Sequence, residues 1–301
     1  MLRALFLSTP LAFATVIAVG VAHASGLSPE PTRPMALAPA PIPLKTGTPS
    51  PLPASPDLST AKIPAADAGN ARRQGGSWRY DGKGGPDNWG DLSPEYRTCS
   101  AGRAQSPVDI DTPGPARLAP VAFRYKLSAV ELANNGHAVQ ANYGEGSYIT
   151  VGGERYELMQ FHFHTPSEHR ITGRSFPMEI HFVHRNAVGR LAVVGVLVTP
   201  GESNLAARQI WDSLPAQPGG SSGNGRTLMN ARDLLPDDAK YFRYGGSLTT
   251  PPCSEQVEWF VLQHPVTFSI EQIARIRGIM GANARPVQPR HGRYLLQGTD
   301  G

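Results

Sequence analysis

The run Gln160-Phe161-His162-Phe163-His164-Thr165-Pro166-Ser167-Glu168-His169 decides how this chain folds and what it holds. Side chains alternate between the two faces of an extended strand, so His162 and His164 point one way and the two phenylalanines point the other. The pattern predicts a strand with one face in an apolar core. Two imidazoles on the other face are spaced to bind one metal ion.

A third imidazole follows in the run Met178-Glu179-Ile180-His181-Phe182-Val183-His184, which alternates in the same way. If this strand pairs with the first, His181 completes a three-histidine site with one open position, which is the donor set of catalytic zinc. An isolated His-x-His pair is more often solvated or structural. The third histidine and the nearby carboxylates favour the metal site here.

Short β-like runs separated by Gly, Pro, Asn and Asp extend outward from this centre, beginning near Trp78. We expect strands at residues 121–125, 137–143, 148–151, 155–158, 191–198 and 257–262. Helical patterns are few, and the best are residues 204–214 and 270–280, with Ser203 and Ser269 as N-caps. The sequence therefore predicts one mixed, β-rich domain over residues 77–298.

The chain before this domain differs in composition. Residues 1–24 predict a secretory signal peptide, with an apolar run after Arg3 and small residues before Ser25; an uncleaved membrane anchor is the alternative. Residues 25–76 hold 11 of the 29 prolines and show no hydrophobic period. Such a segment buries too little apolar surface to offset its ordering entropy, so we expect a disordered linker, either a spacer or a tolerated tail.

Cysteine usage and charge narrow the class of protein further. The 301 residues include two cysteines, Cys99 and Cys253, and secretion would favour a disulfide between them over two buried free thiols. The net charge is +4, the sequence pI is near 9.2, and no dense Lys/Arg run is present. This pattern gives no reason to expect a nucleic-acid partner.

The ordered motifs of this chain resemble the α-class carbonic anhydrases, in particular the secreted bacterial kind. They are Trp89-Gly90, residues 105–110 (QSPVDI), 134–137 (NNGH), 160–164 (QFHFH), 167–169 (SEH), 179–184 (EIHFVH), 246–252 (GSLTTPP) and 283–288 (NARPVQ). The resemblance implies a central, largely antiparallel twisted β-sheet with short peripheral helices. It also implies the Zn²⁺-dependent, reversible hydration of carbon dioxide to bicarbonate and a proton, and cis bonds at Ser106-Pro107 and Pro251-Pro252.

The same resemblance implies roles for individual residues. The zinc ligands would be His162, His164 and His181; their partners would be Gln160, the backbone carbonyl of Asn283, and Glu179. Thr249 would accept the proton of the hydroxide formed at the zinc, and Glu168 would accept the proton of Thr249. Zinc makes hydroxide available near neutral pH, an effect for which carbonic anhydrase is itself the standard example.

The remaining implied residues bind substrate or move protons. The substrate site would be formed by Val183, Val193, Leu248, Thr249, Thr250, Val257 and Trp259. His137 would be the proton shuttle, partly exposed and mobile, with Tyr80, Asn135 and Gln140 ordering the intervening waters. His169 and His184 are expected to be structural, hydrogen-bonded histidines.

Together these expectations describe a secreted zinc lyase, and we expect it in the periplasm. The protein would be a monomer or homodimer, with no stable membrane span after signal cleavage. Two other classes remain as alternatives. One is a zinc-free binding module of the same fold, which would lose ligand histidines. The other is a zinc hydrolase of esters, for which the apolar wall at Val183 and Val193 leaves little room.

Overall fold

The computed structural model describes residues 77–223 and 227–299. The predicted signal peptide and linker, residues 1–24 and 25–76, lie outside these residues. Within the described part no helix is both long enough and apolar enough to cross a membrane.

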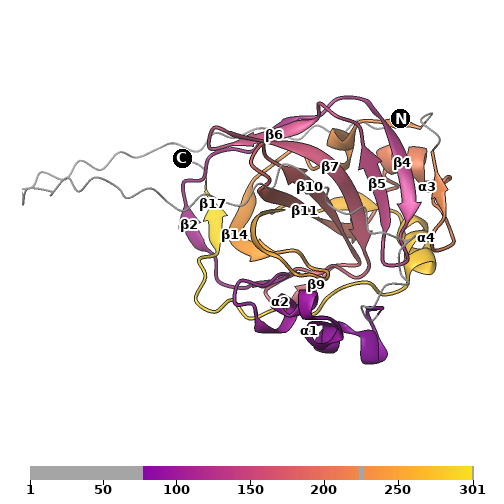
Figure 1. The fold of residues 1–301 in the computed structure, drawn as a ribbon. Coiled ribbons are helices and arrows are strands. Elements are labelled where there is room, and N and C mark those ends of the chain that lie inside the picture. The colour runs from indigo at the N-terminus through magenta and orange to yellow at the C-terminus, as the bar shows by residue number, and fades with distance from the viewer. Residues whose placement is uncertain (1–76, 224–226, 300–301) are drawn as a thin grey trace, which may run out of the picture. The chain divides into compact units, whose positions relative to one another are not determined.

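One mixed, mainly antiparallel sheet organises the described chain, in the strand order β12-β4-β5-β7-β10-β11-β15-β14-β17-β2. Figure 1 shows β7, β10 and β11 side by side in the middle of it. The strands of this path are β2 (Gly114–Ala116), β4 (Ser128–Asn134), β5 (Val139–Tyr143), β7 (Glu154–His164), β10 (Met178–Arg185), β11 (Leu191–Pro200), β12 (Ser221–Ser222), β14 (Tyr241–Ser247), β15 (Glu255–Leu262) and β17 (Leu296–Gly298). The predicted fold class is confirmed.

Shorter strands complete the sheets. The strands β3 (Ala122–Arg124), β6 (Tyr148–Val151), β13 (Leu228–Met229) and β16 (Val266–Phe268) pair with members of the large sheet, and β1 (Asp109–Ile110), β8 (Arg170–Ile171) and β9 (Arg174–Ser175) form a small separate sheet. Parallel pairing occurs where β11 meets β15 and β16, where β17 meets β2 and where β1 meets β8.

Helices are short and peripheral, as expected. They are η1 (Gly82–Gly84), η2 (Pro86–Asn88), α1 (Trp89–Leu92), η3 (Pro94–Tyr96), α2 (Thr98–Ala101), α3 (Leu205–Trp211), η4 (Ala231–Leu234) and α4 (Ile270–Met280). Ser269 caps α4 in a reciprocal capping box with Gln272, as its position predicts. The prediction of Ser203 as the cap of α3 is wrong: Asn204 lies in the extended region and its side chain accepts from the Ala207 amide.

The alternation along the strands separates two apolar clusters across the sheet. Phe161, Phe163 and Phe182 point into the larger cluster. Val183 and Val193, on the opposite face of β10 and β11, belong to a second cluster. Because His162, His164 and His181 share this second face, the strands place three polar rings beside an apolar wall.

Proline geometry matches two expectations and adds a third case. Ser106-Pro107 and Pro251-Pro252 are cis, and so is Thr165-Pro166, which directly follows β7.

Candidate active site

The three expected metal ligands meet on the middle strands of the sheet. In the antiparallel pair β7–β10, His181 lies directly opposite His162, and His164 follows two residues along β7. One nitrogen from each ring lies within 4.8 Å of the others. The strand pairing on which the three-histidine prediction depended is therefore present.

Each ring nitrogen that faces away from this cluster contacts an oxygen that can only accept. The pairs are His162 Nδ1 with Gln160 Oε1 at 2.9 Å, His164 Nδ1 with the Asn283 carbonyl oxygen at 2.7 Å, and His181 Nε2 with Glu179 Oε1 at 2.8 Å. These nitrogens must therefore carry the protons. The unprotonated nitrogens, two Nε2 and one Nδ1, are left for a common ligand, as in zinc sites whose outer partners fix the tautomer.

The electrostatics of the cluster suit a divalent cation. Burial lowers the pKa of all three histidines, that of His164 to about 4, so the rings are neutral at pH 7. His164 Nε2 and Glu168 Oε2 are buried and have no hydrogen-bond partner among the described residues. Buried polar atoms without partners are costly, and a cation bound by the three nitrogens would remove that cost. The residues present therefore fit zinc.

Glu168 lies directly behind the histidines. Its Oε2 is 3.5 Å from His164 Nε2, and its Oε1 accepts from the Arg285 amide at 2.8 Å. Burial raises the pKa of Glu168 to about 7, although a hydrogen bond with the Thr249 side chain lowers it. A cation on the histidines would favour the ionised carboxylate further. Thr249 and Glu168 are therefore neighbours. One carboxylate oxygen, Glu168 Oε2, has no hydrogen-bond partner among the described residues.

The expected substrate wall forms one continuous apolar surface. Val193 pairs across the sheet with Val183 on β10 and with Trp259 on β15. Val183, Val193, Val257 and Trp259 are buried in the same cluster, with Leu248 packed against it. Thr250 is half-buried, and its carbonyl accepts from the Cys253 amide at 2.8 Å.

His137 is half-buried, as the expected partial exposure requires, but its ring is in contact with an aromatic side chain. Its ring stacks on Trp78 with centroids 3.6 Å apart and planes 10° apart. Burial lowers the pKa of His137 to about 4. A side chain stacked on an indole loses water contacts, which penalises its charged form. The sequence contained no signal for this contact, because the two residues are 59 positions apart.

The three residues expected to order waters are placed in different ways. Asn135 Oδ1 accepts from the amides of His137 and Ala138 at 2.9 and 2.8 Å, so it shapes the turn that carries His137. Gln140, on β5, donates to Asn142 Oδ1 at 2.6 Å and pairs with His162 on β7. The Tyr80 hydroxyl is buried and has no protein partner among the described residues.

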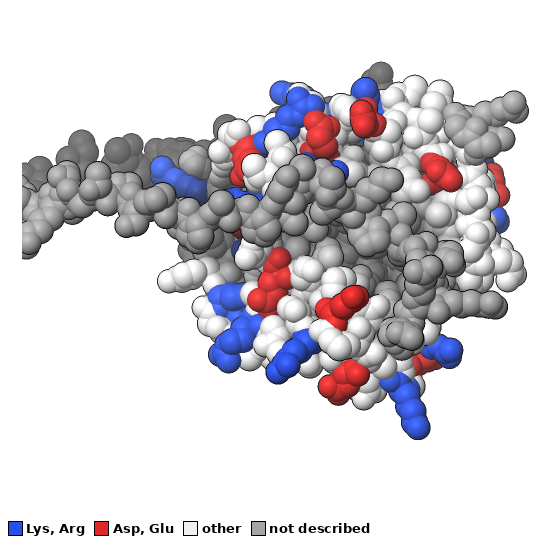
Figure 2. All heavy atoms as spheres, in the orientation of Figure 1, with Lys and Arg blue, Asp and Glu red and all other residues white. Residues whose placement is uncertain are grey.

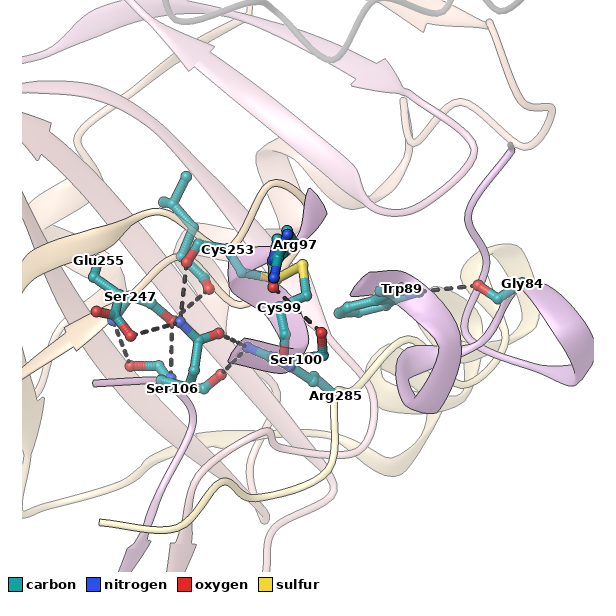
Figure 3. Close-up of a disulfide and its surroundings, with 12 residues drawn as sticks. Gly84, Trp89, Arg97, Cys99, Ser100, Ser106, Ser247, Cys253, Glu255 and Arg285 are labelled. Carbon is teal, nitrogen blue, oxygen red and sulfur yellow. Dashed lines mark hydrogen bonds between the residues drawn. A yellow bond between two sulfur atoms is a disulfide. The ribbon is translucent and has the colours of Figure 1, made fainter. Parts of the chain in front are cut away.

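Cys99 and Cys253 form the expected disulfide, with an S–S distance of 2.09 Å (Figure 3). Arg285 lies beside it and donates through its guanidinium to the Cys99 and Ser106 carbonyls, each at 2.8 Å. Since the Arg285 amide also donates to Glu168, this residue links the disulfide region to the candidate centre. The motif that contains Arg285 is visible in the sequence, but nothing there assigns it this role.

His169 and His184 are structural histidines, as predicted. His184 is fully buried on the other face of β10 and lies 2.6 Å from the Tyr125 hydroxyl. His169 contacts Glu179 Oε1 through Nδ1 at 2.7 Å and the Tyr244 hydroxyl through Nε2 at 2.7 Å. Tyr244 was missed by sequence reasoning, because it lies 75 positions away from His169.

Known proteins resemble this chain closely. The family model for eukaryotic-type carbonic anhydrases matches residues 84–298. A carbonic anhydrase from Pectobacterium atrosepticum is 42% identical over 220 residues, covering 73% of this chain and 90% of that protein. One from Neisseria gonorrhoeae is 41% identical over 246 residues, covering 80% and 97%. The α-carbonic anhydrase of Thermovibrio ammonificans, solved with the inhibitor sulfanilamide, matches with a TM-score of 0.71 at 43% identity, covering 74% and 99%.

Fold and histidine cluster together define a class of β-sheet enzyme built around one candidate metal centre. The chain belongs to the α-carbonic anhydrase family, whose enzymes are lyases, and the resemblance seen in its motifs is confirmed.

Proposed function

We propose that this protein catalyses the reversible hydration of carbon dioxide to bicarbonate and a proton, with zinc held by His162, His164 and His181. The observation that carries the proposal is the set of three inward-facing unprotonated nitrogens beside the partnerless Glu168 Oε2. Family membership supports the same reaction. When bound, zinc supplies hydroxide at neutral pH by lowering the pKa of water.

The residues of this chain position the reactants. The Thr249 hydroxyl donates its proton to Glu168, so its oxygen is left to accept a proton from the nucleophile. That hydrogen bond would orient a lone pair of the nucleophile toward the substrate. Val183, Val193 and Trp259 offer an apolar surface on which carbon dioxide displaces water. A small, uncharged substrate fits this wall better than a bulky ester does.

His137 is proposed to carry the released proton to buffer. A shuttle works best when its pKa is close to that of its proton donor. Stacked on Trp78, with its pKa near 4, His137 is a poor acceptor at neutral pH. We therefore propose that it transfers protons after leaving the indole, when its pKa returns toward the value of about 6.5 usual for histidine.

The proposed location is the periplasm, reached through the signal peptide of residues 1–24. The disulfide supports an oxidising compartment, because cytosolic proteins seldom keep one.

On the face shown in Figure 2, Lys and Arg side chains lie among Asp and Glu side chains instead of gathering in one basic patch.

The test is stopped-flow carbon dioxide hydration by the full mature chain, before and after removal of metal with a chelator. We expect one zinc per chain by atomic emission, loss of hydration on chelation and recovery with one equivalent of zinc. His137→Ala should slow turnover by a factor on the order of 10² in weak buffer, and added imidazole should restore it.

Two results would decide against the proposal. A protein that binds one zinc and does not hydrate carbon dioxide would be a binding module of this fold. A specificity constant for activated esters above that for carbon dioxide would make it a hydrolase.

A further inference from the structure

The carboxylate of Glu179 accepts four hydrogen bonds in a fully buried position. Oε1 is 2.8 Å from His181 Nε2 and 2.7 Å from His169 Nδ1, whereas Oε2 accepts the amides of Glu168 and His169, each at 2.9 Å. An ionised carboxylate has about four acceptor positions, so all of them are used. The orientation of Glu179, and therefore of the His181 ring, depends on every one of these donors.

The donor at His169 Nδ1 depends in turn on Tyr244. A carboxylate oxygen only accepts, so Nδ1 must carry a proton; with no second proton on the ring, Nε2 is an acceptor. The atom 2.7 Å from Nε2 is the Tyr244 hydroxyl oxygen, whose single proton a neutral His169 can accept there. Tyr244 also lies 2.9 Å from Ser106 Oγ, a contact to which the serine can supply the proton.

We propose that Tyr244 is a positioning residue of the metal centre, which acts through His169 on Glu179 and so fixes the proton and ring orientation of His181. This inference rests on the proposed zinc-dependent function. Its consequence is that zinc affinity depends on a tyrosine hydroxyl that touches neither the metal ligands nor the substrate wall with its oxygen. Outer partners of metal ligands commonly change affinity in this way.

The backbone leaves room for both ends of this chain of contacts. A Cβ atom on Gly195 would lie 3.0 Å from Glu179 Oε1, where two histidine donors converge. A Cβ atom on Gly246 would lie 2.2 Å from Ser106 Oγ, the far end of the chain. Neither glycine has a positive φ, so the space, not the backbone conformation, is what requires them here.

A second metal in the group His169, Glu179 and His181 is the competing explanation for these contacts. The two nitrogen–oxygen distances on Glu179 Oε1, 2.7 and 2.8 Å, are ordinary hydrogen-bond lengths. Each requires a proton on the line between its atoms. Hydrogen bonds account for both contacts while His181 Nδ1 faces the proposed zinc, so we assign the group to the positioning network.

Tyr244→Phe tests the proposal, and Tyr241→Phe is the matched control. Both tyrosines lie on β14, both are 3% exposed, and the Tyr241 hydroxyl donates to the Ala119 carbonyl at 2.6 Å, away from the centre. Each variant therefore loses one buried, hydrogen-bonded hydroxyl. We measure zinc affinity by competition with a chelator and the visible spectrum of the cobalt-substituted protein, both on the full mature chain.

Tyr244→Phe should raise the zinc dissociation constant about tenfold, the lower end of the range for loss of an outer partner, and should alter the cobalt spectrum. Tyr241→Phe should leave both unchanged. Equal zinc affinity and equal spectra in the two variants would overturn the proposal. Absence of zinc binding by the unsubstituted chain would instead overturn the proposed function.

A measurement on the unsubstituted protein covers the case in which Tyr244→Phe does not fold. Proton–nitrogen correlation spectra of histidine side chains distinguish the two tautomers. We expect His169 to carry one proton, on Nδ1. A proton on Nε2 would mean that Tyr244 accepts instead of donating, which would overturn the proposal.

Discussion

His137 shows how one contact changes what a residue can do. In the sequence it follows an Asn-Gly pair, which is typical of an exposed turn, and the turn is present with Asn135 Oδ1 holding its amides. The ring, however, stacks on Trp78, and burial holds its pKa near 4. The proton transfer that we propose for His137 would therefore depend on how easily the ring leaves the indole.

Trp78→Ala should raise the pKa of His137 toward about 6.5, because the ring regains its water contacts. An NMR titration of the His137 ring protons measures this directly. Trp78→Phe is the matched control, since a phenyl ring can preserve the stack and keep the pKa low. If Trp78→Ala leaves the pKa near 4, burial against Trp78 is not its cause.

A second residue-scale prediction concerns the core face of the sheet. Tyr125→Phe removes the partner of His184 Nε2, 2.6 Å away, and leaves a buried acceptor unsatisfied. We expect a loss of about 1–3 kcal/mol in the free energy of unfolding, measured by urea denaturation. Tyr294→Phe, at a position 84% exposed, should change stability little. Equal effects at the two sites would contradict this assignment.

At the scale of elements, the connection between β14 and β15 carries Thr249 and is held from several sides. The disulfide ties it to α2 (Figure 3). At the start of β15, Glu255 Oε1 accepts from the Ala104 amide at 2.7 Å. Cys253 itself has φ of 57°, a conformation unusual for a residue with a side chain. The proposed metal ligands, by contrast, lie on β7 and β10, so we expect the proposed metal centre and this connection to respond differently to substitution.

The double variant Cys99→Ser/Cys253→Ser should lower the free energy of unfolding by about 2–5 kcal/mol, because the unfolded chain regains the entropy of a long closed loop. Carbon dioxide hydration should fall as Thr249 loosens, whereas zinc affinity should hold, because its ligands are on rigid strands. Guanidinium denaturation measures the free energy of unfolding, and competition with a chelator measures zinc affinity. A parallel loss of zinc would show that the connection also supports the metal centre.

Over the whole molecule, buried neutral histidines make the folded state sensitive to acid. Burial lowers the pKa of His184 to about 3 and that of His164 to about 4. An unfolded histidine titrates near 6.5, so between that pH and the folded pKa the unfolded chain binds more protons. Their contribution to stability is complete above about pH 6.5 and is lost as the pH falls toward 3.

The free energy of unfolding should therefore fall with decreasing pH below about 6.5, by up to about 1.4 kcal/mol per pH unit for each such histidine. His184→Gln should reduce that slope by about one proton, whatever it does to stability at pH 7. Urea denaturation at several pH values measures the slope. An unchanged slope would mean that His184 is protonated in the folded protein.

The expected domain boundary at residue 77 can also be tested. Residues 77–301 expressed alone should fold, bind one zinc and hydrate carbon dioxide at the rate of a chain that begins at Ser25. The physical reason is that the residues described from 77 onward supply the core clusters and the candidate site. A large loss of stability or rate on removing residues 25–76 would contradict the boundary.

The sequence by itself determined what is local. Alternation within each strand set the two faces of β7 and β10, and it assigned His162, His164 and His181 to the same side of the sheet. The α4 cap at Ser269 is equally local, because its capping partner is three residues away. Motif resemblance added the fold class and the family. The cap of α3 shows the limit, since Ser203 and the adjacent Asn204 are both good caps and packing chooses between them.

Only the tertiary structure decided which distant groups meet. The Arg285 amide reaches Glu168 from 117 positions away, and the Tyr244 hydroxyl reaches His169 from 75. The stack of His137 on Trp78 belongs to the same class of contact. Periodicity encodes the direction of a side chain relative to its own strand, whereas these contacts depend on strand register and on the paths of connecting segments. Both are set by the packing of the whole domain.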